Sequence, residues 1–269
     1  MNLNKITDLL EYNSLIEKYS SIKLYSNDYL QAEVERFILD GVLYEYHAER
    51  NLFLFLKKEI GYRVYYYIGC ETEIIDISTL DNLVIEILYR GDKFYPKAEI
   101  DYLLRCGFSI NLIRDQYCGV HKDLEKTTFY LNINIDYAQD LGEVERACLL
   151  FNESFDVLSG DYISPKSYDE LYAKKEILIA KDLEGKFLGA LHQTIEKGVA
   201  WISHIAVDLE SRGMHVGQAL LDKFVQSNFT TEKQRYMFWV QRQNEVAVRM
   251  YQKKGFKYLN KSTISMIKK

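Results

Sequence analysis

The chain of 269 residues has only two prolines, which excludes proline-rich linkers and stalks. It also has no uncharged apolar run that approaches the roughly 18 residues needed to span a membrane. Residues 1–8 do not have the apolar centre of a signal peptide. We therefore expect no membrane partner and predict a cytoplasmic protein.

Cysteine is sparse and has no pattern. The four cysteines are Cys70, Cys106, Cys118 and Cys148. No two of them form a C-x-x-C pair, and no histidine lies at zinc-ligand spacing from them, so we predict reduced thiols and no metal site. Because Cys148 lies in the apolar run of residues 147–151, it is predicted to be a core residue and not a nucleophile.

An excess of positive charge is also missing. The net charge is −5 and the basic residues are spread along the chain. Without the basic stripe of a protein that neutralises many phosphates, no nucleic-acid partner is expected, whereas a mild acidic balance suits a cationic amine. Hydrophobic residues make up 48% of the chain, which is enough for a globular core.

The hydrophobic patterns indicate two αβ regions, separated by the charged residues 121–127. We predict an N-terminal domain over residues 1–125 and a C-terminal domain over residues 126–269. In the second domain, strands are expected over residues 129–133, 177–180, 187–193, 200–207 and 236–240, and helices over 141–155, 167–173, 216–224 and 245–254. This order predicts an α/β (α+β) fold with a mixed central sheet flanked by helices.

The first domain, which is the smaller one, has a faint likeness to the second. Residues 51–68 resemble residues 176–194, and residues 103–108 resemble residues 251–256. The first domain has no room, however, for the long loop and helix that the second has between its strands ending at residues 207 and 240. Two interpretations stay open: a degenerate copy that lacks its cofactor-binding element, or chance similarity between αβ segments.

The central feature of the second domain is a buried strand that ends at Val207, followed by a polar loop and a helix that begins near Val216. Unpaired N–H groups and the dipole at such a helix start suit a pyrophosphate. Gly213 and Gly217 permit positive φ and close backbone approach, and Arg212 adds a cation. The spacing fits neither the dinucleotide-binding fingerprint nor the P-loop.

This loop resembles the [Q/R]-x-x-G-x-[G/A] signature of the GNAT superfamily of acyl-CoA-dependent N-acyltransferases. The matching residues are Arg212 to Gly217, with His215 at a position where the family usually has glycine. A second stretch resembles the family pattern N-x-x-A-x-x-[LM]-Y-x-x-x-G-F. Its matching residues are Asn244, Ala247, Met250, Tyr251, Gly255 and Phe256. The resemblance covers residues 127–269.

The resemblance implies acetyl-CoA as the co-substrate. The backbone of the central strand would pair with the pantetheine arm, the loop amides would hold the pyrophosphate, and the start of the last helix would reach the pantetheine. The cofactor-binding residues expected from it are Ile205, Ala206, Val207, Arg212, Gly213, Met214, His215, Val216, Gly217, Gln218, Asn244 and Ala247. Lys253 and Lys254 are expected as solvated surface charges, with contact to the 3′-phosphate as the alternative.

Two catalytic residues are predicted. Tyr251 matches the family position that protonates the departing CoA thiolate, and a phenol beside the sulfur can donate that proton. Some relatives have a glutamate as the base on the central strand, where this chain has Trp201, so His204 is the nearest titratable candidate. The alternative for His204 is a structural histidine that is hydrogen-bonded within the sheet.

The leading hypothesis is an N-acetyltransferase that acts on a primary amine of a small molecule or peptide by direct attack. The alternative is a catalytically weak or inactive CoA-binding or regulatory module, favoured by His215 and by the missing glutamate. A third hypothesis, a structural protein, predicts no CoA binding at all. The sequence identifies neither the acceptor amine nor the oligomeric state.

Overall fold

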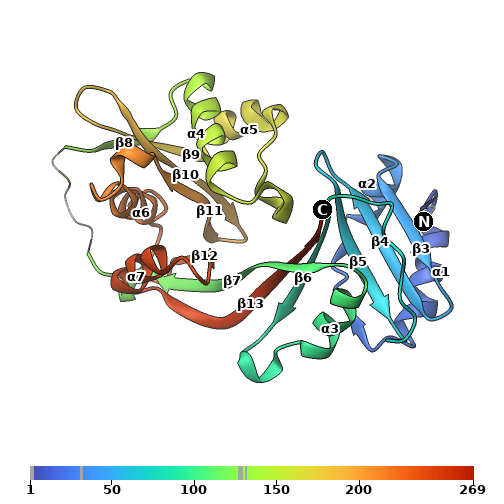
Figure 1. Ribbon diagram of the computed structural model, residues 1–269. Coiled ribbons are helices and arrows are strands. Elements are labelled where there is room, and N and C mark those ends of the chain that lie inside the picture. The colour runs from blue at the N-terminus through green and yellow to red at the C-terminus, as the bar shows by residue number, and fades with distance from the viewer. Residues whose placement is uncertain (1–2, 31–32, 127–129, 131) are drawn as a thin grey trace. The chain divides into compact units, whose positions relative to one another are not determined.

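The computed structural model describes residues 3–30, 33–126, 130 and 132–269 (Figure 1). The chain divides into two compact units, one of residues 1–113 with 261–269 and one of residues 114–260. Two long strands, β7 (Ser109–Val120) and β13 (Lys257–Lys268), each begin in one unit and end in the other. Because of this exchange, the compact units do not follow the predicted linear division at residue 125.

The unit of residues 114–260 is built on one mixed sheet. Its strand order is β8 (Asn134–Tyr137), β9 (Ile177–Lys181), β10 (Phe187–Glu196), β11 (Val199–Val207), β12 (Arg235–Gln241) and residues 114–120 of β7. Only β11 and β12 are parallel; the other neighbours are antiparallel. Helices α4 (Leu141–Ser154) and α5 (Tyr168–Ala173) cover one face, and α6 (Val216–Ser227) and α7 (Glu245–Lys254) cover the other (Figure 1).

The unit of residues 1–113 and 261–269 is also built on strands of mixed direction. The strand order is β1 (Asn4–Lys5), β3 (Leu43–His47), β4 (Asn51–Lys57), β5 (Tyr62–Ile68), β6 (Leu83–Tyr89) and residues 261–268 of β13, with β2 (Tyr25–Ser26) beside β5. Only β5 and β6 are parallel. Helices α1 (Leu9–Ser20) and α2 (Val34–Leu39) pack on one face and α3 (Lys97–Arg105) on the other.

The two units therefore repeat one topology. Strands β1, β3, β4, β5 and β6 hold the places of β8, β9, β10, β11 and β12, and the exchanged ends of β13 and β7 hold equivalent places beside β6 and β12. Helices α1, α2 and α3 correspond to α4, α5 and α7, and no described helix of the first unit corresponds to α6. This agreement favours the interpretation of a degenerate copy.

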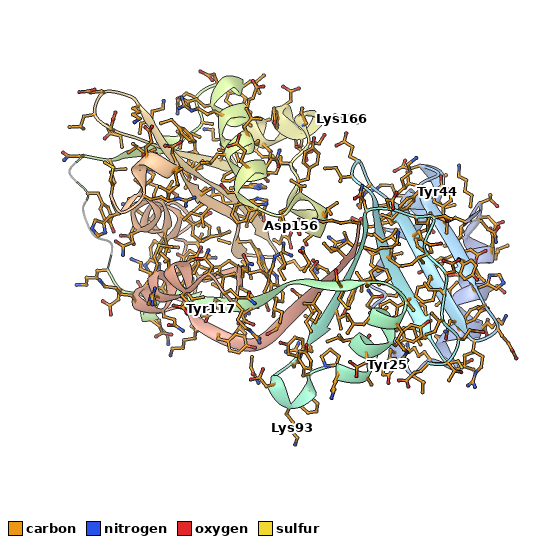
Figure 2. The ribbon with its side chains drawn as sticks, viewed as in Figure 1. Tyr25, Tyr44, Lys93, Tyr117, Asp156 and Lys166 are labelled. Carbon is orange, nitrogen blue, oxygen red and sulfur yellow. The ribbon has the colours of Figure 1, made fainter. Side chains whose placement is uncertain are left out.

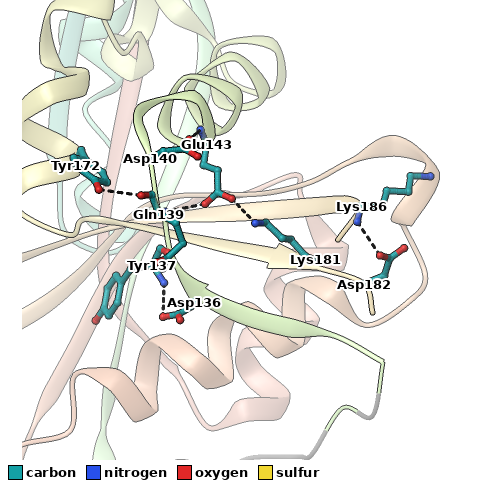
Figure 3. Close-up of polar contacts among 9 residues, drawn as sticks. All are labelled: Asp136, Tyr137, Gln139, Asp140, Glu143, Tyr172, Lys181, Asp182 and Lys186. Carbon is teal, nitrogen blue, oxygen red and sulfur yellow. Dashed lines mark hydrogen bonds and ion pairs between the residues drawn. The ribbon is translucent and has the colours of Figure 1, made fainter. Parts of the chain in front are cut away.

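Local details support the repeat. Asp8 and Asp140 cap α1 and α4 by accepting hydrogen bonds from the backbone N–H groups of Glu11 and Glu143, at 2.8 and 2.9 Å. Each glutamate in turn accepts a bond from the N–H group of the residue before its aspartate. Figure 3 shows this contact between Gln139 and Glu143. This reciprocal arrangement is a capping box, and it fixes the start of the equivalent helix in both units.

The predicted sequence alignment of the repeat was correct at one place and wrong at another. Residues 103–108 and 251–256 do correspond, since both lead from a helix through a left-handed glycine, Gly107 or Gly255, into β7 or β13. Residues 51–68, however, form β4 and β5, whereas residues 176–194 cover β9 and most of β10. That likeness was displaced by one strand, because hydrophobic hairpins of similar length follow one another in this fold.

Most predicted elements are found within a few residues. The predicted strand over residues 129–133 falls partly outside the described residues, and β8 starts after it at Asn134. Among the described helices, none has the length and apolar character needed to cross a bilayer.

Candidate functional site

The two parallel strands at the centre of the 114–260 unit pair over only part of their length. Their register runs from Val199 opposite Arg235 to Ile202 opposite Phe238, although β11 continues to Val207 and β12 to Gln241. The backbone of residues 203–207 in β11 is therefore not paired with β12. An extended ligand could pair with this edge as an added strand.

A β-bulge lies where the pairing stops. His192 pairs with His204 and Gln193 with Ile202, so Ser203 is an extra residue in β11. A bulge of this kind re-aims the side chains that follow it. Before it, Ile202 packs with the α6 and α7 side of the sheet. After it, Ala206 packs with the α4 side, and the ring of His204 stacks on Phe151 of α4.

The predicted phosphate loop begins after β11 and ends at the N-terminus of α6. Gly213 has φ +81°, and His215, the residue that caps α6, has φ +63°. Glycine adopts this left-handed conformation without steric cost, which explains the glycine at the position of His215 in the family pattern. The His215 ring is held against the first turn of α6, with Nδ1 2.7 Å from Oε1 of Gln218.

The amides of this loop fit an anion. In the first turn of a helix the N–H groups have no partner within the helix, and here they belong to Val216, Gly217 and Gln218. The amides of Arg212 and Met214 make only long turn bonds, of 3.4 Å each. The donors and the helix dipole therefore converge at the start of α6.

Of the two glycines expected to permit positive φ and close backbone approach, only Gly213 adopts a positive φ. Gly217 lies inside α6 and is not among the residues with positive φ, whereas Gly213 is. A β-carbon at Gly217 would lie 3.5 Å from Sδ of Met250 and 3.6 Å from Cγ2 of Val207. The glycine lies where β11, α6 and α7 meet. The position therefore limits the size of the side chain and does not require an unusual backbone conformation.

The start and the middle of α7 carry the other predicted contacts. Asn244 caps α7, with its side-chain oxygen accepting a 3.1 Å hydrogen bond from the N–H group of Ala247, so its carbonyl has a structural task. Tyr251 is buried, with its ring 4.0 Å from that of Phe238. Burial raises the pKa of Tyr251, which keeps the phenol protonated and able to donate.

Lys254 is not the solvated surface charge that was expected. Its Nζ is 2.5 Å from a carboxylate oxygen of Asp222 on α6, and both side chains are buried. This ion pair joins α7 to α6. Lys253 is exposed, as predicted.

His204 is buried in an aromatic environment. Its ring lies 5.3 Å from Phe151 and 5.1 Å from Phe155, and it stacks on His192 with an interplanar angle of 10°. Burial, the neighbouring His192 and the charge of Arg114 lower the pKa of His204 to about 3. The ring is therefore neutral at physiological pH. It lies on the α4 face of the sheet, whereas Tyr251 lies on the α6 and α7 face.

The sequence analysis missed His192 and Glu176. His192 on β10 has its Nδ1 3.2 Å from Nδ1 of His204, and its Nε2 3.7 Å from Oε2 of Glu176. The strand pattern around His192 shows a half-buried strand, but its pairing with His204 depends on the register and on the bulge. Neither can be inferred from spacing along the chain.

In the first unit, the pairing of β5 and β6 also stops early, but a side chain of the unit itself occupies the space between the two strands. Strands β5 and β6 pair only at residues 62–63 and 83–84. Beyond that point the side-chain amide of Asn27 donates to the carbonyl oxygens of Val64 and Glu86, at 3.2 and 3.1 Å, and accepts from the N–H group of Tyr66 at 2.8 Å. Asn27 thus bridges the two strands where an added ligand would pair.

Comparisons with known proteins agree with this geometry. Residues 144–256 match the model of a family described as the acetyltransferase (GNAT) family. No curated protein matches the chain. Among solved structures, a GCN5-related N-acetyltransferase from Sphaerobacter thermophilus is 13% identical with a TM-score of 0.57, and the match covers 80% of this chain and 75% of that one.

Two other solved structures match more of the chain. A GCN5-related N-acetyltransferase from Kribbella flavida is 12% identical with a TM-score of 0.54, over 88% of this chain and 95% of that one. A tandem GNAT protein from the clavulanic acid biosynthesis pathway is 10% identical with a TM-score of 0.55, over 98% of this chain and 97% of that one. At these identities the likeness is one of fold, and the tandem protein shares it over nearly the whole length.

Proposed function

Since residues 144–256 form a domain of the acetyltransferase (GNAT) family, we propose that the chain transfers an acetyl group from acetyl-CoA to a primary amine. The observation that carries the proposal is the parting of β11 and β12 after Ile202, next to the amide-rich start of α6. The acceptor amine belongs to a small molecule or a peptide.

The residues present fit acetyl-CoA. The backbone of residues 205–207 lies outside the β11–β12 ladder and suits the amides of a pantetheine arm. The first-turn amides of α6, with Gly213 and Arg212 before them, suit a pyrophosphate. Acetyl-CoA would supply the activated acetyl group, and the chain would supply positioning and proton transfer.

The proposed reaction needs no covalent intermediate with the protein. The amine nitrogen attacks the thioester carbon, and the carbon–sulfur bond breaks as the tetrahedral intermediate collapses. Tyr251 donates its phenolic hydrogen to the departing sulfur. Because the buried phenol stays protonated, this donor is present throughout the physiological pH range.

A CoA-binding or regulatory module stays the second candidate. Strand β11 has no carboxylate in residues 199–207, so a base must come from another element or another residue type. His215 also replaces the glycine of the family pattern with a side chain. Binding and turnover must therefore be measured separately.

The binding test is isothermal titration of acetyl-CoA into the purified chain. We expect micromolar-range affinity, about 8 kcal/mol at 1 μM. The expected stoichiometry is one acetyl-CoA per chain, because Asn27 fills the equivalent place in the first unit. Gly217→Trp should abolish binding, whereas Gln226→Trp, at the exposed far end of α6, should leave it unchanged. An unmodified chain that binds no acetyl-CoA contradicts the proposal.

The turnover test is Tyr251→Phe. We expect the acetylation rate to fall about 10²-fold, because the proton donor is lost, while acetyl-CoA affinity stays within about twofold. Tyr258→Phe, at a partly exposed ring of the same unit, is the matched control and should change neither. If acetyl-CoA binds but none of a broad panel of primary amines is acetylated, the binding module becomes the better assignment.

A further inference from the structure

Three titratable side chains on adjacent strands form a line in the 114–260 unit. Glu176 precedes β9, His192 lies on β10 and His204 on β11, and His192 and His204 are direct cross-strand partners. The imidazole Nδ1 atoms are 3.2 Å apart, and Nε2 of His192 is 3.7 Å from Oε2 of Glu176. All three side chains are mostly buried, and their exposure rises along the line, from 8% for His204 to 12% for His192 and 20% for Glu176. The line therefore runs from the sheet interior to solvent.

The charges around the line fix its protons. Two imidazole Nδ1 atoms at 3.2 Å need one proton between them, so one ring donates and the other accepts. If His192 donated from Nδ1, its bare Nε2 would face the carboxylate of Glu176. The favoured arrangement has His192 protonated on Nε2, towards Glu176, and His204 protonated on Nδ1, towards His192. The Nε2 of His204 is then a lone-pair acceptor, and it makes no hydrogen bond of normal geometry to the described residues. The backbone of Asp161 lies near the ring and opposes the lowering of its pKa, so the proton position of His204 is the feature to measure first.

We propose that Glu176, His192 and His204 form a proton relay that takes the proton lost by the acceptor amine from the parting of β11 and β12 to solvent. The inference rests on the proposed function. His204 is the entry point, because it lies one residue beyond the bulge at which β11 leaves β12. His192 acts through His204 and is a positioning residue, and so is Glu176.

Each transfer is balanced. The ammonium nitrogen of the acceptor loses one proton to Nε2 of His204 as its lone pair becomes the nucleophile. His204 passes the proton on its Nδ1 to Nδ1 of His192, and His192 passes the proton on its Nε2 to the carboxylate of Glu176. The last gap, 3.7 Å, exceeds a hydrogen bond and is bridged by a water molecule or a small rotation. Glu176 releases the proton to solvent.

The surroundings require the transfers to be concerted. Phe151 and Phe155 flank His204, the guanidinium of Arg114 lies near it, and Arg114 is paired with Asp161. Burial, the neighbouring His192 and the charge of Arg114 lower the pKa of His204 to about 3, and burial lowers that of His192 to about 4. A lasting imidazolium is thus disfavoured at either ring. A ring that accepts and donates in one step never holds the charge, which ends on the carboxylate.

The first test is independent of turnover. Nitrogen-15 NMR of the histidine side chains in the full chain reports which ring nitrogen carries the proton. We expect His204 to be protonated on Nδ1 and His192 on Nε2, both neutral at pH 7. A proton on Nε2 of His204, or on Nδ1 of His192, overturns the relay whether or not the chain acetylates an amine.

The second test is the pH dependence of kcat/KM for a reactive amine. Without the relay, only amine already neutral in solution reacts, so His192→Gln should move the rising limb to higher pH and lower kcat about 10²-fold at pH 7. Glu176→Gln should act in the same direction, with acetyl-CoA affinity unchanged in both. The control is His121→Gln, which removes an imidazole bonded to Tyr236 elsewhere in the unit and should leave the limb in place.

The outcomes separate the two proposals. If the chain transfers acetyl groups but His192→Gln does not shift the rising limb of the pH profile, the relay is wrong. The proposed function is then left intact. A chain that binds acetyl-CoA but transfers no acetyl group overturns the proposed function. The side-chain NMR result then still decides whether the proton arrangement exists.

Discussion

Two single side chains, His192 and His204, link the folding stability of the 114–260 unit to pH. Burial lowers their pKa values to about 4 and about 3, from an ordinary value of 6.5. Between pH 4 and 6.5 the unfolded chain therefore binds more protons than the folded one, so stability rises with pH in this window and is lost as pH falls. We expect the free energy of unfolding to drop by about 2 kcal/mol per histidine between pH 7.5 and pH 5.

Urea unfolding of the unmodified chain and of His192→Gln at the two pH values measures this effect. The variant should lose less stability on acidification, because one of the two buried imidazoles is gone. An equal loss in both proteins would show that other groups, and not this pair, set the acid sensitivity.

The element on which the site depends most is β11, and a glycine on its neighbour controls its position. A β-carbon at Gly189 of β10 would lie 2.6 Å from the carbonyl oxygen of Ala206 and 3.1 Å from Cα of Val207. Gly189→Ala must therefore displace the strand edge proposed to pair with acetyl-CoA. We expect a loss of about 1–3 kcal/mol in stability and weaker acetyl-CoA binding, measured by urea unfolding and titration.

Gly217→Ala is the matched control for this change. The nearest atoms to its β-carbon are at 3.5 and 3.6 Å, an ordinary contact distance, and alanine is favoured over glycine in a helix. Stability should be unchanged or slightly higher, and acetyl-CoA should still bind. If both alanine variants behaved alike, the close approach of Gly189 to β11 would not be what limits this position.

For the molecule as a whole, the exchange of strand ends predicts which fragments fold. Residues 114–120 of β7 pair with β12, and Tyr117 of this strand is labelled in Figure 2. Its ring stacks on that of Phe238 with an interplanar angle of 2°. A fragment of residues 126–269 lacks this strand and leaves residues 261–268 without β6. We expect it to be unfolded or aggregated, whereas residues 114–260 should melt cooperatively and bind acetyl-CoA. Circular dichroism melts of both fragments and the full chain test this, and cooperative melting of 126–269 at the temperature of the full chain would contradict it.

The sequence predicted where helices α6 and α7 begin. The loop before α6 and the start of α7 have their own spacing of glycine, asparagine and tyrosine, so roles could be proposed for Arg212, Asn244 and Tyr251 from neighbours along the chain. The left-handed backbone at His215 could not be assigned, because the residue there is not glycine. Positive φ was expected to be possible at Gly213, where it is found, and at Gly217, where it is not.

Features that depend on pairing between distant segments could not be predicted. The line from Glu176 to His204 exists only because β10 pairs with β11 in one register with one extra residue. The buried pair of Lys254 and Asp222 joins two helices that are far apart in sequence. The sequences of β7 and β13 likewise do not show that each strand passes from one unit to the other. The alternation of side chains along a strand does not depend on which strand it pairs with.

The exchanged strands also bear on how such a chain can evolve. In an ordinary tandem repeat, a copy that has lost its cofactor element can be deleted, because the other copy folds without it. Here each copy ends its sheet with a strand encoded beside the other one. A deletion that runs to residue 125 would also remove residues 114–120, which pair with β12. Only a deletion that stops near residue 113 leaves the second copy whole, so few deletions of the first copy are tolerated.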